Sequence, residues 1–415
     1  MMREAKSSGI AWIGTIPKCW ETDKLKYHLR RNEPRNPGDV VVLSLYRELG
    51  VIPKDSRDDN HNVTSEDTSK YKYVRPGDFV INKMKAWQGS VAVSEYEGIV
   101  SPAYFVYEFT DDTIFKRYFH YLLRSCYKDE FMRLSGGIRV GQWDLPADAL
   151  ENTPILIPPM DEQCRIADFL DTKCAEIDAL TADIQTQIDT LEQYKRSVIT
   201  ETVTKGLNPN AEMKDSGIQW IGDMPVHWNV IRGKYILHYM QKPVREDDGV
   251  ITCFRDGEVT LRSNRREEGF TMSDKEIGYQ GIDVGDLVVH GMDGFAGSIG
   301  ISDSRGKASP VLNVLETDQN KRYIMYYLRS MAYSDVFLAL ATGIRVRSCD
   351  LRWNKLADLS YPVPPLDEQK AIVEHIDAVL AKADAVISDK KAQLATLDEY
   401  KKSLIFEYVT GKKEV

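Results

Sequence analysis

Apolar residues recur at seven-residue intervals in two long segments of the chain. The row in the first segment consists of Leu170, Ile177, Ile184, Leu191 and Val198. The row in the second segment consists of Ile376, Ala383, Leu397 and Leu404, and Lys390 interrupts it. Such a repeat is typical of a coiled coil or of paired helices. We therefore expect two long helices that pack on each other along these seams.

The turns between the row residues also carry apolar side chains, and we expect them to complete the seam. These residues are Ile166, Leu180, Ile188 and Tyr194 in the first segment and Ile372, Val379, Val386 and Leu394 in the second. The pairs Pro158-Pro159 and Pro364-Pro365 lie just before the predicted helix starts, where a helix cannot yet run. The acidic pair that follows each of them favours a helix N-terminus.

Each helical segment follows about 150 residues with a different pattern. Short alternating or apolar runs between Gly and Pro residues predict strands. The strands are expected at Asp39–Leu45, Asp78–Ile81, Ala103–Phe109 and Asp286–His290. Aromatic and aliphatic residues at helical spacing predict one helix in each region, over Thr113–Leu134 and Lys321–Ala341. Each region is therefore predicted to be a compact α/β (α+β) globule.

The two halves of the chain are copies of one plan. Ser8–Trp20 and Ser216–Trp228 share 8 of 13 residues at an offset of 208, including two tryptophans. The offset is 206 by the time that Pro158–Gln163 matches Pro364–Gln369. We expect a pseudo-twofold internal repeat in which two long antiparallel helices separate two similar globules. The predicted globules are residues 1–157 and 207–363. The predicted long helices are residues 158–206 and 364–415.

Composition excludes some classes of protein. The 415 residues are 42% hydrophobic, and no apolar run is long enough for a membrane-spanning helix. The N-terminus lacks the layout of a signal peptide. The six cysteines are scattered without a Cys-x-x-Cys pair, which indicates reduced thiols in a cytoplasmic protein rather than disulfides or a zinc site.

The net charge of −9 is concentrated in the predicted helices. Residues 161–206 and 367–415 together carry −7, so the globules are nearly neutral and can present a basic face. Arg, Lys, Gln and Asn beside aromatic residues suit phosphates and base edges. Solvated surface charge beside core tryptophans is the alternative explanation. The candidate DNA-binding residues are Arg47, Lys83, Lys85, Trp87, Gln88, Arg139, Gln142, Arg255, Arg262, Asn264, Arg265, Arg266, Arg345 and Arg347.

Catalytic motifs are missing from the sequence. There is no Walker A loop, no dinucleotide-binding fingerprint and no His-Glu-x-x-His zinc motif. Ile157–Met160 and Val363–Leu366 lack the acid or amide and the aromatic residue that DNA amino-methyltransferases place around Pro-Pro. We therefore predict a protein that is not an enzyme, with no catalytic residues, no metal site and no cofactor of its own.

The ordered set of duplicated motifs resembles the specificity subunits of type I restriction-modification systems. The motifs are Pro-Pro-x-Asp-Glu-Gln at Pro158–Gln163 and Pro364–Gln369, Gly-Ile-Arg-Val at Gly137–Val140 and Gly343–Val346, Leu-x-x-Tyr-Lys at Leu191–Lys195 and Leu397–Lys401, and the shared tryptophan segment. The resemblance covers essentially the whole chain. The interrupting Lys390 departs from the regular row and puts the seam register at that position in doubt.

The resemblance implies that the globules are target-recognition domains. Each would read one half of a bipartite, asymmetric site on double-stranded DNA. The helices would dock two methyltransferase subunits and, through them, restriction and translocase subunits. S-adenosylmethionine, ATP and magnesium would then bind to the partner subunits. The helix residues assigned to the seam or to partners are Leu170, Ile177, Ile184, Leu191, Val198, Ile376, Val379, Leu397 and Leu404.

Two other classes of function remain open on the sequence. A methyltransferase with a fused recognition domain would bind S-adenosylmethionine as an isolated chain. A coiled-coil scaffold without a role in DNA recognition would show no salt-dependent duplex binding in its assembled complex.

Overall fold

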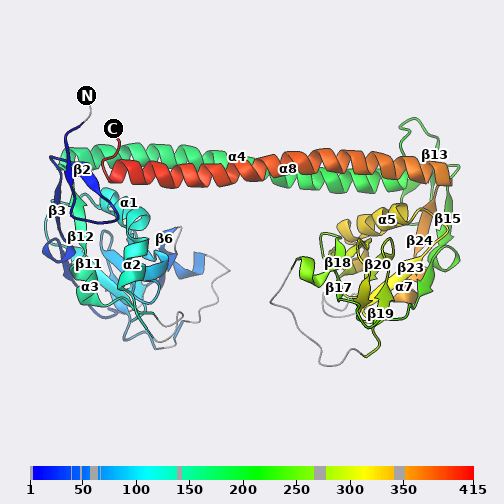
Figure 1. The fold of residues 1–415 in the computed structure, drawn as a ribbon, viewed down its shortest axis with the longest axis horizontal. Coiled ribbons are helices and arrows are strands. Elements are labelled where there is room, and N and C mark those ends of the chain that lie inside the picture. Colours follow the sequence, from blue (N-terminus) through cyan, green and yellow to red (C-terminus); the bar gives the residue numbers. More distant parts are fainter. Residues whose placement is uncertain are drawn as a thin grey trace. The chain divides into compact units, whose positions relative to one another are not determined.

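A computed structural model gives the fold (Figure 1). It describes residues 3–38, 40–46, 49–56, 64–65, 67–137, 143–265, 277–340 and 351–415. The chain forms two compact units. The N-terminal unit holds residues 1–184 and 392–415, and the C-terminal unit holds residues 185–391. Each unit therefore combines one globule with parts of both long helices.

The N-terminal unit is built on a four-stranded antiparallel sheet in the order β4-β11-β8-β9. Every residue of the central strand β8 is buried, which explains its continuous apolar run. Shorter strand pairs surround this sheet. The strands are β1 (Ala5–Ser7), β2 (Thr15–Pro17), β3 (Glu21–Lys24), β4 (Leu29–Arg31), β5 (Leu43–Tyr46), β6 (Gly50–Pro53), β7 (Lys72–Val74), β8 (Phe79–Asn82), β9 (Val91–Val93), β10 (Gly98–Val100), β11 (Tyr104–Phe109) and β12 (Pro154–Ile157).

The C-terminal unit repeats this topology strand for strand. Its four-stranded sheet has the order β16-β23-β20-β21, and the same smaller pairs surround it. The strands are β13 (Met213–Asp215), β14 (Asp223–Pro225), β15 (Asn229–Arg232), β16 (His238–Met240), β17 (Ile251–Cys253), β18 (Val259–Leu261), β19 (Gln280–Ile282), β20 (Leu287–His290), β21 (Ile299–Ile301), β22 (Gly306–Ala308), β23 (Leu312–Glu316) and β24 (Ser360–Val363). The internal repeat of the sequence is thus a repeat of the fold.

The helix predicted in each globule is broken into two. The first becomes α1 (Lys116–Cys126) and α2 (Lys128–Leu134), which buried Tyr127 separates with φ −110° and ψ 0°. The Tyr127 hydroxyl donates to Pro154 O. The second becomes α5 (Lys321–Tyr333) and α6 (Val336–Ala339), which Asp335 separates in a left-handed conformation. Two shorter helices, α3 (Ala147–Glu151) and α7 (Trp353–Asp358), precede the last strand of each globule.

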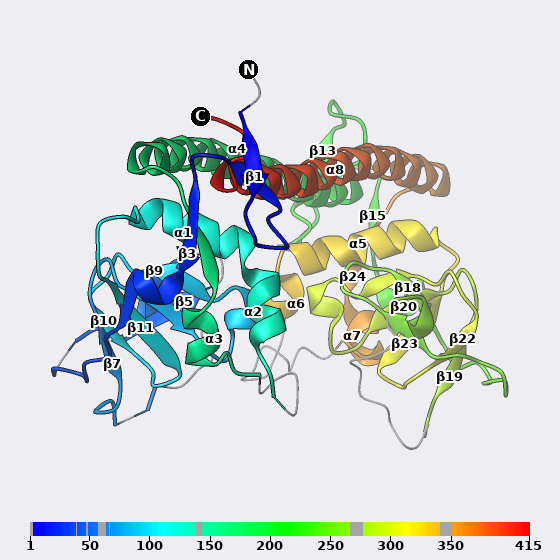
Figure 2. The same ribbon diagram turned by 60° about the vertical axis from the view of Figure 1, so that its left-hand side comes forward.

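The two long helices are α4 (Met160–Lys205) and α8 (Leu366–Val409). Figure 2 shows α1 between α4 and the sheet of the N-terminal unit, and α5 in the corresponding place below α8. Within each unit the two helices run antiparallel. In the N-terminal unit, Phe169 contacts Tyr408 and Asp178 pairs with Lys401 further along α4. In the C-terminal unit, Gln187 contacts Lys390 and Lys195 pairs with Asp384.

A buried glutamine joins the start of each long helix to its globule. The Gln163 side chain accepts from Phe115 N at 2.7 Å and donates to Thr113 O and Pro158 O at 2.8 Å. Gln369 does the same in the second copy, accepting from Asn320 N and donating to Pro364 O. These contacts fix where the long helix leaves the globule relative to the start of α1 or α5. They give the repeated Pro-Pro-x-Asp-Glu-Gln motif a structural role.

The glutamate beside each glutamine receives the indole N–H of the shared tryptophan. Trp20 donates to Glu162 at 2.9 Å, and Trp228 donates to Glu368 at 3.1 Å. Both indoles are buried, so each N–H needs such an acceptor. The duplicated tryptophan segment and the duplicated acidic motif are therefore parts of one contact.

The end of each long helix packs on the globule in which the other long helix begins. Tyr118 of α1 donates its hydroxyl to Val409 O at the end of α8, and Tyr323 of α5 donates to Val203 O near the end of α4. Lys412, beyond α8, donates to Ile13 O at 3.0 Å. The described ends of the chain consequently lie together in the N-terminal unit (Figure 1).

The seam residues of α4 and α8 are buried or half-buried. Leu170, Ile177, Ile184, Ile376 and Leu404 are buried, and Leu191, Val198, Val379 and Leu397 are half-buried. The prediction that Leu180, Tyr194 and Val386 complete the seam is wrong, because all three are exposed. Each of these three follows a row residue by three positions and therefore lies about 60° to one side of the row.

Cross-helix polar contacts are also duplicated. Lys195 pairs with Asp384 and Lys401 pairs with Asp178, each at 2.6 Å. Exposed pairs of this kind contribute about 0–1 kcal/mol, so they define register more than stability. Lys390, which interrupts the apolar row, donates across the seam to Gln187. Buried Ile387 supplies the apolar contact in that turn.

No helix in the described ranges is long and apolar enough to cross a membrane. Five cysteines lie in the described ranges, and all five are free thiols.

Replacing Gln163 with Ala should lower the free energy of unfolding by about 2–4 kcal/mol, because it leaves buried backbone groups without partners. Gln193 lies on the same helix but is exposed, so Gln193→Ala should change stability by less than about 0.5 kcal/mol. Denaturant unfolding followed by circular dichroism measures both values. Equal stability of the two variants would contradict the proposed role of the buried amide.

Candidate nucleic-acid interface

A tight turn at the end of β8 carries the first group of candidate residues. Asn82 N donates to Ser90 O, and Gly89, in a left-handed conformation, donates to Ala86 O and closes the short helix η3 (Ala86–Gln88). Lys85 is exposed on this turn, and Lys83, Trp87 and Gln88 are half-buried. These backbone hydrogen bonds hold the turn in one conformation. Its side chains therefore extend from a fixed backbone.

The segment before α3 lies against this turn. Lys83 donates to Asp144 at 2.9 Å, and the rings of Trp87 and Trp143 meet edge to face at 5.5 Å. Leu145 N donates to Lys83 O at 3.0 Å. The structure therefore brings candidates from residues 83–88 together with the residues that follow the Gly-Ile-Arg-Val motif.

Two cations beside this turn, Arg31 and Lys72, were not among the candidates from the sequence, and they join Lys83 around one aromatic ring. Arg31, Lys72 and Lys83 lie 4.5, 5.5 and 5.9 Å from the centre of the Phe105 ring. Burial opposes the ionisation of nearby Glu33, but hydrogen bonds from Arg31 and Lys72 hold its pKa below the usual value. The register of β4, β7 and β11 brings these residues together, and no local sequence signal marks them.

The C-terminal unit has the same turn with other side chains. His290 N donates to Ser298 O, and left-handed Gly297 donates to Gly294 O around the short helix η7 (Gly294–Ala296). Asp293 holds the place of Lys85 and pairs with Arg255 at 3.1 Å. Leu351 N donates to Gly291 O, as Leu145 does to Lys83 in the first copy. The scaffold is shared, and the charges on it are not.

The remaining described candidates lie on the β17–β18 hairpin and the short helix η6 (Arg262–Asn264) that follows it. Arg265 pairs with Asp256 at 2.7 Å and Glu258 at 2.9 Å, and its guanidinium lies 4.2 Å from the centre of the Phe254 ring. Arg262 and Asn264 contact the hydroxyls of Thr252 and Thr260. Internal contacts therefore already engage these side chains.

Six candidates fall outside the described residues. They are Arg47, Arg139, Gln142, Arg266, Arg345 and Arg347.

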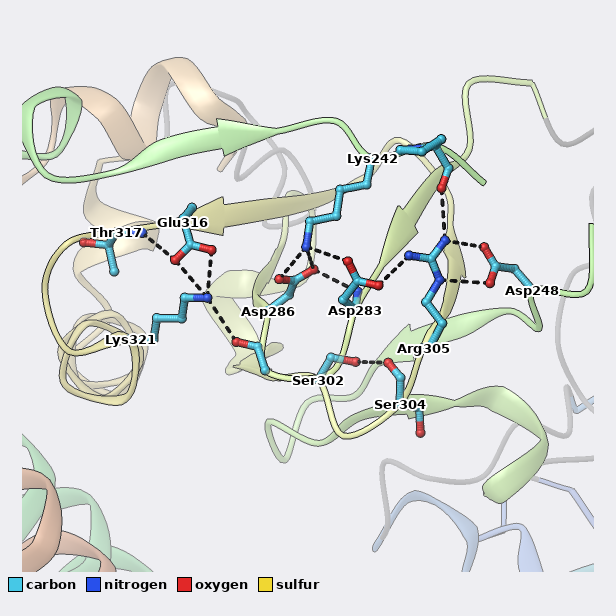
Figure 3. Close-up of polar contacts among 12 residues, drawn as sticks. Lys242, Asp248, Asp283, Asp286, Ser302, Ser304, Arg305, Glu316, Thr317 and Lys321 are labelled. Carbon is cyan, nitrogen blue, oxygen red and sulfur yellow. Dashed lines mark hydrogen bonds and ion pairs between the residues drawn. The ribbon is translucent and has the colours of Figure 1, made fainter. Parts of the chain in front are cut away.

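Other cations of the C-terminal unit are used inside an ionic network (Figure 3). Lys242 donates to Asp283 and Asp286, and Arg305 bridges Asp248 and Asp283. Hydrogen bonds from Lys242 and Arg305 lower the pKa of Asp283 to about 2. These contacts hold the end of β16 against β19 and β22, so Lys242 and Arg305 support the sheet.

No metal site is evident among the residues that the structure describes. No group of three or more His, Cys, Asp or Glu side chains there could hold a metal ion.

Residues 28–190 match the family described as the type I restriction modification DNA specificity domain. Over 97% of its length the chain is 24% identical to the putative type I restriction enzyme MjaX specificity subunit of Methanocaldococcus jannaschii, of which it covers 96%. It is also 24% identical to the MjaVIII specificity subunit of the same organism, over 96% of this chain and 94% of the relative. The chain is therefore similar over nearly its whole length to type I specificity subunits, and residues 28–190 match their DNA specificity domain.

A solved chain from a type I restriction-modification system agrees in fold. It was studied for complex assembly and conformational transition, and it aligns with a TM-score of 0.69 and 15% identity over 96% of this chain and 99% of its own length. The similar proteins are named as specificity subunits, and the matched segment is described as a DNA specificity domain. This agrees with the missing catalytic motifs in the sequence.

The turn at residues 290–298 should be sensitive to acid. His290 Nδ1 accepts from Met292 N at 3.2 Å and from Asp293 N at 2.9 Å, which requires that nitrogen to be unprotonated. Burial lowers the pKa of His290; Arg255 lowers it further, and Asp293 opposes the shift. Because the unfolded chain binds this proton more readily, the C-terminal unit should lose stability as pH falls below about 6.5.

His290→Asn places in this turn the residue type of Asn82, which accepts from Met84 N in the first globule. The variant should lose the part of the pH dependence of stability that comes from His290. The measurement is the difference in unfolding free energy between pH 7 and pH 5.5, compared with His375→Asn, which alters an exposed histidine on α8. The same pH dependence in the His290 variant and the wild type would show that the turn does not sense the proton.

Proposed function

We propose that each globule reads one half of a bipartite, asymmetric DNA site as part of a type I restriction-modification complex. The observation that carries this proposal is the pair of turns at residues 82–90 and 290–298. Their backbone hydrogen bonds are the same, but Lys83, Lys85 and Gln88 in one correspond to Gly291, Asp293 and Ala296 in the other. A shared scaffold with different polar side chains suits two half-sites that differ in sequence.

The long helices supply the surface for the methyltransferase subunits. Leu180 and Tyr194 are exposed on α4, and the corresponding Val386 and Tyr400 are exposed on α8. The two members of each pair are 14 residues apart and share a helix face. Leu180 and Tyr400 lie in the N-terminal unit, and Tyr194 and Val386 lie in the C-terminal unit. Two equivalent apolar faces suit two copies of one partner.

The catalytic chemistry then belongs to the partners. S-adenosylmethionine would bind to the methyltransferase subunits, and ATP and magnesium would bind to restriction and translocase subunits. The complex would act in the cytoplasm, in keeping with free thiols in this chain.

Replacing Lys85 with Ala should relax the recognition of one half-site by about 1–3 kcal/mol and leave the other half-site unchanged. Lys85 is exposed on the turn of one globule and has an acidic counterpart in the other. Sequencing of methylated bases after expression of the complex in a host without other methylation reads both half-sites at once. Lys24→Ala, which changes an exposed lysine on β3 of the same globule, is the matched control.

An equal loss of affinity on every duplex, with a salt dependence reduced by about one counterion, would instead place Lys85 on a phosphate. The absence of salt-dependent duplex binding by the assembled wild-type complex would contradict the proposed function and favour a scaffold.

Replacing either Tyr194 or Tyr400 with Ala should weaken the binding of one methyltransferase subunit, and the double variant should fail to hold two. Loss of a buried aromatic contact at an interface costs about 2 kcal/mol or more, or roughly 30-fold in affinity. Native mass spectrometry of the mixed subunits reports the stoichiometry. Tyr96→Ala changes an exposed tyrosine of the first globule, where the second copy has Ser304, and should leave two partners bound.

A full complement of partners on the double variant would remove this face from the docking surface.

A further inference from the structure

An exposed methionine lies at the same place in both globules. Met84 is 43% exposed and Met292 is 52% exposed, each on the turn that follows the central strand. Single exposed apolar residues are common on protein surfaces. An exposed apolar residue repeated at corresponding positions, in two turns whose polar residues differ, calls for a shared contact.

The backbone places the two methionines in the same way through different residues. Met84 N donates to the side chain of Asn82 at 3.2 Å, and Met292 N donates to His290 Nδ1 at 3.2 Å. An amide oxygen and an imidazole nitrogen thus perform the same task. The rest of each turn is closed by the left-handed glycine described above, so the methionine projects from a fixed support.

The surroundings of the methionines show what kind of partner contacts them. On the long helices, where we propose two copies of one protein partner, Lys195 and Asp384 recur as Lys401 and Asp178. Around the methionines the charges do not recur, since Lys85 corresponds to Asp293. A protein bound twice would meet the same charges twice. Two half-sites of one duplex share their shape and stacking and differ in their polar groups.

We propose that Met84 and Met292 make a sequence-tolerant apolar contact with the bases of their half-sites, against a groove edge or a base step. This proposal rests on the proposed function and assigns it a further pair of binding residues. Methionine side chains are unbranched and adapt to different surfaces, and methionine is among the side chains that proteins press against base steps. The neighbouring unshared residues would then supply the discrimination between sequences.

The test uses the complex assembled with its methyltransferase subunits and a duplex that carries the site mapped for the wild type. Met84→Ala and Met292→Ala should each weaken binding about 5- to 50-fold, the loss expected when an apolar contact of this size is removed. The salt dependence and both mapped half-sites should remain unchanged. Met84→Leu, which keeps an apolar side chain of similar volume, should bind within about threefold of the wild type.

Two other exposed methionines serve as matched controls. Met132 on α2 is 44% exposed and Met213 on β13 is 38% exposed, and neither lies on a turn of this kind. Their Ala variants should bind the duplex like the wild type.

Affinities of the Met84 and Met292 variants equal to those of the controls would overturn the inference. Loss of a methyltransferase subunit from either variant would overturn it too, since the contact would then be with protein. A changed base preference in one half-site would show that the methionine reads sequence and would contradict the tolerance proposed. If the wild-type complex itself shows no salt-dependent duplex binding, the proposed function fails, and this inference falls with it.

Discussion

The buried amide at the start of each long helix is the contact on which the architecture depends. Gln163 and Gln369 are fully buried, and their side chains satisfy backbone groups at the start of α1 or α5 as well as a proline carbonyl just before the long helix. A buried amide tolerates little displacement, because each lost hydrogen bond leaves a desolvated polar group. The direction in which the helix leaves the globule is therefore fixed by polar contacts, and apolar packing along the helix follows from it.

This contact and others between globule and helix explain why the two halves share a fold although many of their surface residues differ. The shared residues include those that join the globule to the helices: the tryptophan and its glutamate, the glutamine, and the tyrosine that receives the end of the other helix. The sheets are held by different means. The N-terminal unit gathers Arg31 and Lys72 around Glu33, and the C-terminal unit uses the network of Lys242 and Arg305 (Figure 3).

The two halves share the residues that join globule and helix but differ in the charged residues on their surfaces, and this difference bears on DNA recognition. Basic residues are not equivalent once their partners are known. Arg265 is engaged by two carboxylates and an aromatic ring, whereas Lys85 is exposed on a rigid turn. A side chain that must break internal ion pairs to reach DNA gains less from the new contact than one that is exposed from the start.

The sequence by itself determined the repeat, the two long helices and their starts, because periodicity and proline placement act over a few residues and appear twice. It also indicated the resemblance to type I specificity subunits, through motifs in a fixed order. It did not determine which apolar residues close the seam. Leu180, Tyr194 and Val386, three positions after a row residue, lie on the outer face of the helix. Ile188 and Ile387, four positions after one, lie inside.

Only the tertiary structure decided the contacts between residues far apart in the chain. Tyr127, at the break between α1 and α2, donates to Pro154 O, and the cations around Phe105 meet through strand register. The burial of Gln163 follows from its contact with a helix start about 50 residues earlier in the chain. Each of these is a polar or aromatic contact whose partner is set by packing of the whole globule. No local pattern carries that information.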